Sequence, residues 1–380
     1  MRSSVIISAL VAVLVGFGSS VAIIIAAAHA VGATEAQTAS WISGACAATM
    51  FSTAVLSIRF RIPIVAAWST PGAAMIATTT GITLPEAAGA FILAAALILL
   101  TAAFRPINAL IAKIPQAVAS AMLAGVLFGF VVAVFVHLNA IPQLVLPMVL
   151  LFIVARIFSP SWAVLAVLAL GVVLVYALGM AKPLEELRLS TFEIIVPEFN
   201  VSVLIGLGLP LYLVTMASQN LPGFAVLRSA GYEAPTRAIL AVTGFGSLVT
   251  AAFGAHTTNL AAITASICTG EDAHPDKDKR WLTGPVYAVG YAVLTLIGAS
   301  VVVLFASFPP ELVATIAGIA LLGPLVGALG NSLDSHGDRF AAVITFVVTA
   351  SGMSLFGIGA AFWGLLAGIA VYGLDRLLKR

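Results

Sequence analysis

The chain has 380 residues, of which 61% are hydrophobic and only 8% are charged, and its mean hydropathy is +1.15. Because globular domains carry roughly 25% charged residues, this composition excludes a water-soluble domain and indicates a polytopic membrane protein in a lipid bilayer. The formal net charge of +2 gives no support to a nucleic-acid partner. Cys46 and Cys268 each lie alone in an apolar segment, so we expect no disulfide, no metal site and no cofactor.

Seven hydrophobic runs come before Lys182, and a membrane span needs about 20 apolar residues. They cover residues 5–29, 37–57, 64–80, 84–104, 115–137, 142–158 and 161–180. The third run is short and contains Pro71. The first run has a small-residue motif at residues 28–30, but it is longer than the roughly 7 to 15 residues of a signal-peptide core, so we interpret it as a retained span.

Residues 181–199 form the most polar stretch of the first 227 residues and predict a linker between two halves, 1–180 and 200–380. The second half has seven further hydrophobic runs, and again the third is the short one. They cover residues 201–223, 236–253, 256–269, 282–307, 310–330, 339–354 and 360–377. The sequence therefore predicts an all-α membrane protein with fourteen transmembrane segments.

Two short repeats relate the halves. Residues 67–75 align with residues 255–263 with four identities, and residues 115–120 align with residues 310–315 at the start of the fifth span of each half. Because each half has an odd number of spans, the two copies must have opposite orientations in the membrane. We therefore predict a seven-plus-seven inverted repeat.

The distribution of Lys and Arg predicts the orientation of the chain. With a cytoplasmic N-terminus, fifteen of the seventeen Lys and Arg residues lie on the cytoplasmic side, and only Lys182 and Arg188 lie outside. This is a strong positive-inside bias. We expect both termini in the cytoplasm and the linker on the outer side.

Polar residues in the two short spans and in the eighth span are the candidate binding site. In both copies of the first repeat, hydroxyl or amide residues precede small apolar ones, which predicts a helix N-terminus whose positive dipole end faces a substrate. Pro71 suits a first helical turn. The candidate substrate-binding residues are Ser69, Thr70, Pro71, Gly72, Ser218, Gln219, Asn220, His256, Thr257, Thr258 and Asn259.

Each candidate also has a structural interpretation. Serine and threonine commonly bond the backbone or a neighbouring helix, which is the favoured interpretation for the weaker candidates Ser19 and Ser20. The adjacent amides Gln219 and Asn220 are costly in hydrocarbon unless satisfied, either by a ligand or by another helix. The sequence contains no phosphate-binding loop, no zinc-protease motif and no nucleophile elbow, so we do not expect an enzyme.

Residues 217–223, 63–72 and 253–259 resemble the benzoate/proton symporter family of bacterial inner-membrane transporters, and the resemblance covers essentially the whole chain. It implies kinship with uracil, xanthine and sulfate-type transporters. In that group a core domain and a gate domain interleave both repeats, and the third and tenth spans each contain a short strand followed by a half-helix. The resemblance implies that substrate binds between these half-helices.

One departure from the related nucleobase transporters concerns the substrate. Those proteins use carboxylates on the eighth and tenth spans, whereas this chain has Gln219 with Asn220 and the residues 256–259 there. Dipole ends with hydroxyl and amide donors and no fixed negative charge suit an anion such as a carboxylate. Trp68, Phe17 and Phe253 are candidate aromatic neighbours for a ring.

We therefore predict a secondary active transporter that imports benzoate or a related aromatic carboxylate with protons by alternating access. The alternatives are an anion channel or exchanger of the same fold and a transporter of another small organic anion. His256 is the one ionisable residue that we place near the site, which makes it the candidate for proton coupling. A homodimer is a candidate assembly.

Overall fold

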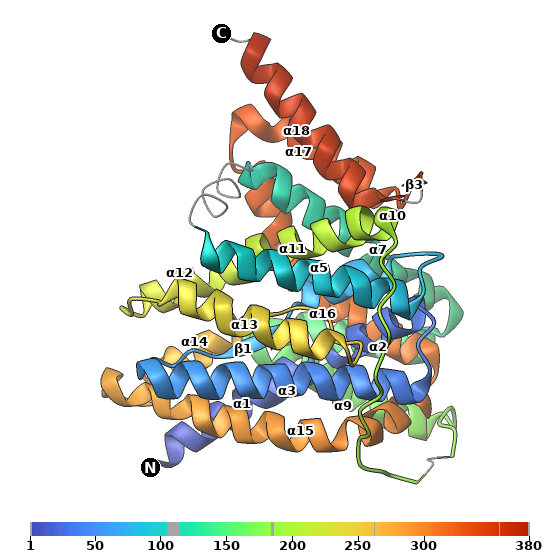
Figure 1. The fold of residues 1–380 in the computed structure, drawn as a ribbon. Helices are drawn as coiled ribbons and strands as arrows, with labels where there is room; N and C mark the ends of the chain where they lie inside the picture. The colour runs from blue at the N-terminus through green and yellow to red at the C-terminus, as the bar shows by residue number, and fades with distance from the viewer. Residues whose placement is uncertain (1, 105–114, 184–185, 262, 357, 379–380) are drawn as a thin grey trace.

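The computed structural model describes residues 2–104, 115–183, 186–261, 263–356 and 358–378, and most of them are helical (Figure 1). The elements of the first half are α1 (Ser3–Gly18), α2 (Val21–Ala30), α3 (Glu35–Phe60), β1 (Ala66–Trp68), α4 (Thr70–Ala77), α5 (Leu84–Ala103), α7 (Gln116–Ala140), α8 (Pro142–Phe158) and α9 (Pro160–Ala177). Two of these helices begin with a capping box, in which Thr34 pairs with Gln37 and Thr83 with Glu86.

The second half begins with one long segment, residues 201–229, in which two π-helical turns interrupt the α-helix. Its parts are α10 (Val201–Val203), η1 (Leu204–Gly208), α11 (Leu209–Thr215), η2 (Met216–Asn220) and α12 (Leu221–Ser229). The remaining elements are α13 (Thr236–Ala251), β2 (Thr258–Leu260), α14 (Ile263–Thr269), η3 (Lys277–Leu282), α15 (Thr283–Ala306), α16 (Pro310–Leu333), η4 (His336–Asp338), α17 (Arg339–Ala350), β3 (Ser354–Leu355), β4 (Ile358–Gly359) and α18 (Ala360–Leu378).

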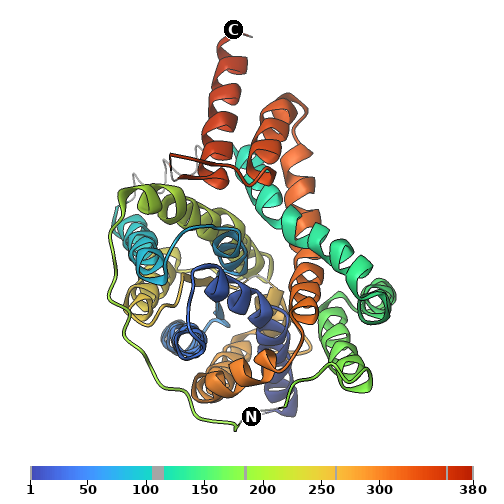
Figure 2. The ribbon, with the colours of Figure 1, turned by 90° about the vertical axis from the view of Figure 1, so that its right-hand side faces the viewer.

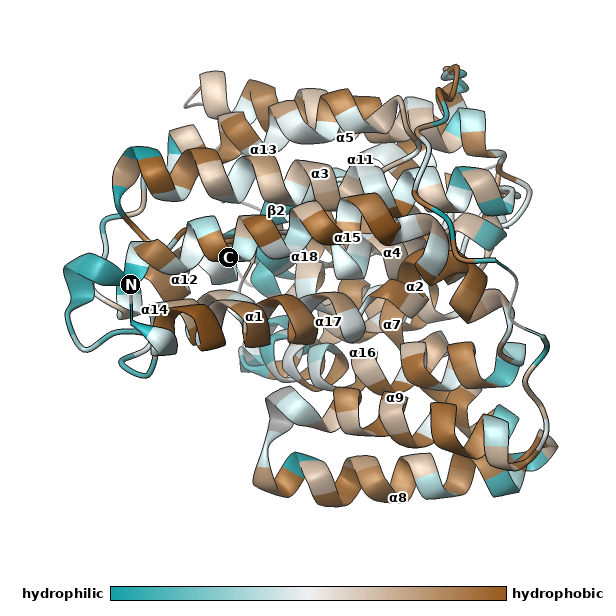
Figure 3. Ribbon diagram, turned by 90° about the horizontal axis from the view of Figure 1, so that it is seen from below, coloured by the Kyte–Doolittle hydropathy of each residue, from teal (hydrophilic) through white to brown (hydrophobic). Residues whose placement is uncertain are grey.

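Each predicted hydrophobic run coincides with helix or with a strand followed by a half-helix, and the first run is divided into α1 and α2 at Ser19 and Ser20. Among the described residues, eight helical segments are long and apolar enough to cross a membrane, and three shorter apolar helices cover residues 142–158, 162–177 and 236–251. The multi-pass helical fold is confirmed, while the crossing of the membrane by all fourteen segments stays a prediction. Figure 3 shows the hydrophobic residues along the helices and the most hydrophilic ones in the connections at their ends.

The described elements pack into two groups (Figure 2). We call α1–α5 and α10–α15, with β1 and β2, the core group, and α7–α9 with α16–α18 the gate group. Both halves of the chain contribute to each group, since α3 packs on α13 and α15, and α7 packs on α16 and α17. This interleaving is what the core and gate domains of the predicted fold require.

The segment between α9 and α10 is extended and runs around the outside of the core group (Figure 2). Its backbone N–H groups bond to three core helices or their ends: Ser190 to Leu296, Ile195 to Ala252 and Glu198 to Pro85. The position of this predicted linker on the outer side of the membrane, and the division into 1–180 and 200–380, stay predictions.

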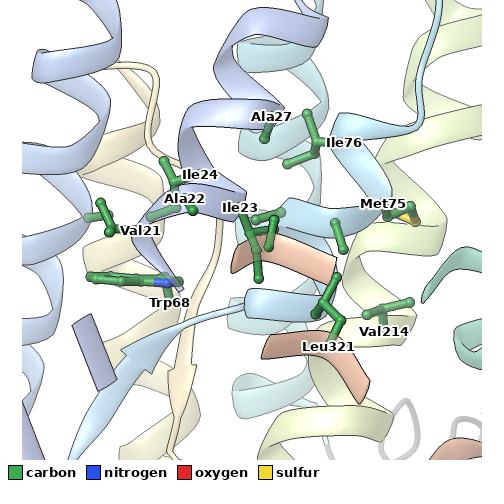
Figure 4. Close-up of a cluster of buried hydrophobic side chains, with 14 of the residues drawn as sticks. Val21, Ala22, Ile23, Ile24, Ala27, Trp68, Met75, Ile76, Val214 and Leu321 are labelled. Carbon is green, nitrogen blue, oxygen red and sulfur yellow. The ribbon is translucent and has the colours of Figure 1, made fainter. Parts of the chain in front are cut away.

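A buried apolar cluster holds the half-helix α4 in the interior (Figure 4). Ile23 of α2 and Ile76 of α4 are fully buried, and Met75 of α4 belongs to the same cluster as Val214 of α11 and Leu321 of α16. Because α16 belongs to the gate group, this cluster joins the two groups. It does so beside α4, the half-helix of the interrupted third span.

Candidate functional site

The two short strands meet inside the core group and form an antiparallel pair. Ala66 faces Leu260, Ala67 faces Asn259 and Trp68 faces Thr258. The pairing continues at both ends, because the Ser69 N–H bonds to the Thr257 carbonyl at 2.9 Å and the Ala261 N–H bonds to the Val65 carbonyl at 3.0 Å. Extended backbone at membrane depth must find its hydrogen bonds within the protein, and each strand supplies them to the other.

The first half-helix begins as predicted. Ser69 is the N-cap of α4, and its Oγ accepts a hydrogen bond from the Gly72 N–H at 3.1 Å. Pro71 lies in the first turn, where its missing N–H costs nothing. A Cβ at Gly72 would lie 2.6 Å from Leu211 Cδ1 and 2.8 Å from the capping Ser69 Oγ, so a side chain here would have to displace the end of Leu211 and disturb the cap.

The predicted start of the second half-helix at Thr257 and Thr258 is wrong. Thr258 lies in β2, and α14 begins at Ile263. The reason is the pairing with β1, which keeps residues 257–261 extended. The sequence repeat aligns Ala67 of the first strand with Ala255. In the sheet, the residue that faces Ala67 is Asn259, so the second strand lies later in the chain than the repeat predicts.

His256 is completely buried, and both of its ring nitrogens are satisfied. Nδ1 lies 3.0 Å from the indole N–H of Trp41, which can only donate, and Nε2 lies 3.0 Å from the Ser69 carbonyl, which can only accept. These two partners fix a neutral imidazole with its proton on Nε2. In this conformation His256 therefore ties α3 to the start of α4.

The other predicted residues of this stretch also bind protein groups. The Thr257 hydroxyl lies 2.7 Å from the hydroxyl of Thr215, and Asn220 Oδ1 accepts the Leu260 N–H at 2.9 Å. Asn259 donates to the Leu260 carbonyl at 3.0 Å. All of these residues are fully buried, and the bonds of Thr215 and Asn220 hold β2 and its start against the eighth span. Among the described residues, Thr258 Oγ1 and Asn259 Oδ1 have no partner.

Two prolines explain the π-helical turns of the eighth span. Each turn ends two residues before a proline, η1 before Pro210 and η2 before Pro222. Proline cannot donate to the carbonyl four residues earlier, so the ladder shifts to a wider bond, from Leu209 to Leu204 and from Leu221 to Met216. At η2 the wider turn presents Ser218 and Gln219 on one side and Asn220 on the other.

A cavity of about 1100 Å³ lies between the core group and the gate group. Its core side includes Ser19, Pro71, Ser218 and Gln219, and its gate side includes Gln116 and Phe152 among others. No other described residue bonds to the side chains of Ser218 and Gln219, which are therefore open to a ligand. Both serines at the break between α1 and α2 bond their own helix, at Val15 and Gly16, as the structural interpretation proposed.

The cavity separates the predicted site residues into two sets. Pro71, Ser218 and Gln219 line it. The remaining candidates lie outside its lining: Ser69, Thr70, Gly72, Asn220, His256, Thr257, Thr258 and Asn259. A direct contact between these residues and substrate stays a prediction. All of them except Thr70 are buried, and most have hydrogen-bond partners within the protein.

The aromatic candidates are outside the cavity lining as well. Trp68 is buried, donates to Ser20 Oγ at 3.0 Å and packs edge-on against Phe17, and Phe253 packs against Phe192 of the linker. The rings that do line the cavity are Phe152 and Tyr372, both from the gate group.

Sequence reasoning missed the whole gate side of the cavity. Gln116 lies in the second repeat, which predicts topology alone, and Arg156 is one of the fifteen basic residues of the positive-inside pattern. The signal that could have found this side was the first copy of that repeat, because Gln116, Ala119 and Ser120 at the start of the fifth span all line the cavity.

Comparison with known proteins places the chain among membrane transporters. A family model described as "Benzoate membrane transport protein" matches residues 1–374. The Escherichia coli K12 inner membrane protein YdcO is 41% identical over 98% of this chain and 96% of its own length. The benzoate membrane transport protein of Acinetobacter baylyi is 36% identical over 97% of this chain and 94% of its own length.

Solved structures with the same fold are much more distant in sequence. The structure of SLC26A9 has a TM-score of 0.67 at 12% identity and covers 98% of this chain, which spans 66% of that protein. The transmembrane domain of the cyanobacterial bicarbonate transporter BicA has a TM-score of 0.59 at 14% identity, with 99% of this chain and 97% of that domain covered. These similarities confirm the predicted inverted-repeat transporter fold.

Proposed function

Because this chain belongs to the benzoate membrane transport protein family, we propose that it imports benzoate or a related aromatic carboxylate across the bacterial inner membrane together with protons. The observation that carries the proposal is the cavity between the core and gate groups, whose core wall is formed by α1, the first turn of α4 and the eighth span with its π-helical turn. A concave, largely apolar site with a few open polar groups is the usual form of a small-molecule site.

The core wall offers what a carboxylate needs. Gln219 can donate through its amide and Ser218 through its hydroxyl, and Pro71 brings the first turn of α4 to the cavity surface. The positive end of a helix dipole favours an anion there. Apolar residues such as Val15, Leu213 and Met122 line the same cavity and would surround an aromatic ring.

Alternating access would follow from movement between the two groups. The cavity extends from the helix breaks to Asn331 and Asp338 at the ends of gate-group elements. The positive-inside orientation puts those ends in the cytoplasm, so we propose that this structure is the inward-facing form. Rocking of the gate group against the core group would close this side and open the other.

Proton coupling is favoured by energetics. Moving an anion into a negative interior costs about 2.3 kcal/mol for each 100 mV of membrane potential, and one accompanying proton removes this cost. An electroneutral symporter should therefore respond to a pH gradient and ignore the potential.

Benzoate uptake into proteoliposomes tests the proposal. At zero potential, an acidic exterior should drive accumulation faster than in protein-free liposomes, which report the passive entry of protonated benzoic acid. At equal pH, an imposed potential should have no effect. A flux that follows the potential and ignores the pH gradient would identify an anion channel instead, and uptake that requires internal benzoate would identify an exchanger.

A further inference from the structure

Arg156 places a cation in the cavity on its gate side. It lies in the last turn of α8, lines the cavity and is exposed. Its guanidinium carbon lies 5.8 Å from the ring centroid of Phe152, one helical turn earlier, and Phe152 lines the same cavity. Opposite it, a Cβ at Gly323 would lie 3.4 Å from Arg156 Nη1, so the glycine leaves space beside the guanidinium.

The charges around this cavity are few. Arg156 and Asp338 are the two charged side chains among the described residues that line it. No described carboxylate lies within ion-pairing distance of the Arg156 guanidinium. A guanidinium with free donors in a mostly apolar cavity is a strong attractor for an anion, and its planar fork matches a carboxylate with two parallel hydrogen bonds.

We propose that Arg156 and Phe152 form a second binding position for an aromatic carboxylate on the gate side, separate from Ser218 and Gln219 on the core side. The guanidinium holds the carboxylate, and the ring of Phe152 contacts the aromatic ring of the ligand. This inference rests on the proposed function. It gives the substrate a position to occupy between the core wall and the cytoplasmic solution.

A purely structural role for Arg156 makes a different prediction. A cation in the last turn of a helix stabilises the helix dipole wherever it occurs. In that case loss of the charge would lower protein stability, and it would not change the preference of the protein for a charged ligand over a neutral one.

Ligand discrimination by the purified full-length protein separates these roles. We expect Arg156→Gln to weaken benzoate binding about tenfold to a hundredfold, the loss that accompanies removal of a charge-assisted hydrogen bond. Competition by benzamide, which has the same ring and no charge, should be unchanged. The benzoate affinity of Arg156→Lys should fall between those of wild type and Arg156→Gln, because lysine keeps the charge and loses the planar fork of donors. Arg237→Gln, at the start of α13 and outside the cavity lining, is the matched control.

A measurement on the unmodified protein covers the case in which Arg156→Gln does not fold. Benzoate should slow the reaction of Arg156 with phenylglyoxal, as read by peptide mass spectrometry, and should not slow the reaction of Arg237. Equal benzoate binding by wild type and Arg156→Gln, a parallel loss of benzoate and benzamide, or unprotected Arg156 would overturn this inference alone. Absence of benzoate binding by the wild-type protein would overturn the proposed function and the inference with it.

Discussion

Gln219 and Asn220 are neighbours in the chain, but the π-helical turn gives them different surroundings. Gln219 faces the cavity and has no partner among the described residues. Asn220 is fully buried, accepts the Leu260 N–H and donates to Met216 Sδ at 3.4 Å. The sequence suggested one role for both amides, and the structure separates them into a cavity-facing group and a structural one.

Gln219→Leu should impair transport and leave folding intact. Leucine removes the amide that is open to substrate, so benzoate binding should weaken by about 1 to 3 kcal/mol. Binding to purified protein and uptake into proteoliposomes measure the effect, and the thermal unfolding midpoint is the control. Wild-type affinity in this variant would remove Gln219 from the substrate site.

Asn220→Leu should instead destabilise the protein. It leaves the buried Leu260 N–H of β2 without an acceptor, which costs about 1 to 3 kcal/mol. The unfolding midpoint in detergent should fall relative to wild type and to Gln219→Leu. If Asn220→Leu melts like wild type but no longer binds benzoate, its amide acts on the ligand rather than on β2.

His256 provides a test of proton coupling. Its two hydrogen bonds require the neutral ring, because a second proton on Nδ1 would remove the acceptor of the Trp41 indole. We therefore expect His256→Gln to lower the unfolding midpoint but to keep the wild-type dependence of benzoate binding on pH between roughly 5.5 and 8, where histidine titrates. A flattened pH profile in a folded variant would restore His256 as the proton carrier.

At the scale of elements, the sequence predicted each interrupted span but only one of the two helix starts. Ser69, Thr70 and Pro71 carry a local N-terminal signal, and α4 begins there. Thr257 and Thr258 carry a similar local signal, but their backbone pairs with β1, a contact across nearly 200 residues that no local pattern encodes. The gate side of the cavity escaped prediction for the same reason, since Arg156 becomes a cavity residue only when α8 packs in the gate group.

The strand position of Thr258 reverses an expectation based on a helix start. A hydroxyl that caps a half-helix beside substrate would contribute to binding, whereas Thr258 Oγ1 is buried in β2 without a described partner. Thr258→Val removes an unsatisfied polar atom and keeps the shape, so stability should stay equal or rise and benzoate affinity should not change. The thermal unfolding midpoint and the benzoate affinity of this variant measure the two expected effects. Weaker binding would place the Thr258 hydroxyl at the substrate.

At the scale of the whole molecule, the cavity depends on how the two groups meet. The core group carries β1, β2, the half-helices and the π-helical turns, while the gate group supplies continuous helices and the opposite wall. Contacts between α2 and α16, α4 and α7, and α1 and α9 join the groups around the cavity. Since the helix breaks, Ser218 and Gln219 all lie on the core side, movement of the gate group can change access without dismantling the core-side site.

Cysteine labelling in oriented membrane vesicles tests the orientation and the open side together. Asn331→Cys lies at the mouth of the cavity, near the end of α16. Ser218→Cys lies farther inside the cavity, at the π-helical turn, and Leu187→Cys lies in the exposed linker. The native Cys46 and Cys268 are fully buried and should not react. With an impermeant maleimide, Asn331→Cys and Ser218→Cys should label from the cytoplasmic face, and Leu187→Cys should label from the opposite face.

The same labelling experiment in the presence of benzoate tests whether substrate binds beside the core wall. A ligand beside the core wall should slow labelling of Ser218→Cys, while the linker cysteine should react at an unchanged rate because it lies outside the cavity. Labelling of Ser218→Cys only from the face that labels the linker would show that the cavity opens outward, and the proposed inward-facing assignment would then be wrong. Labelling of all three cysteines from one face would contradict the inverted topology itself, since the linker follows an odd number of predicted spans and must lie opposite the N-terminus.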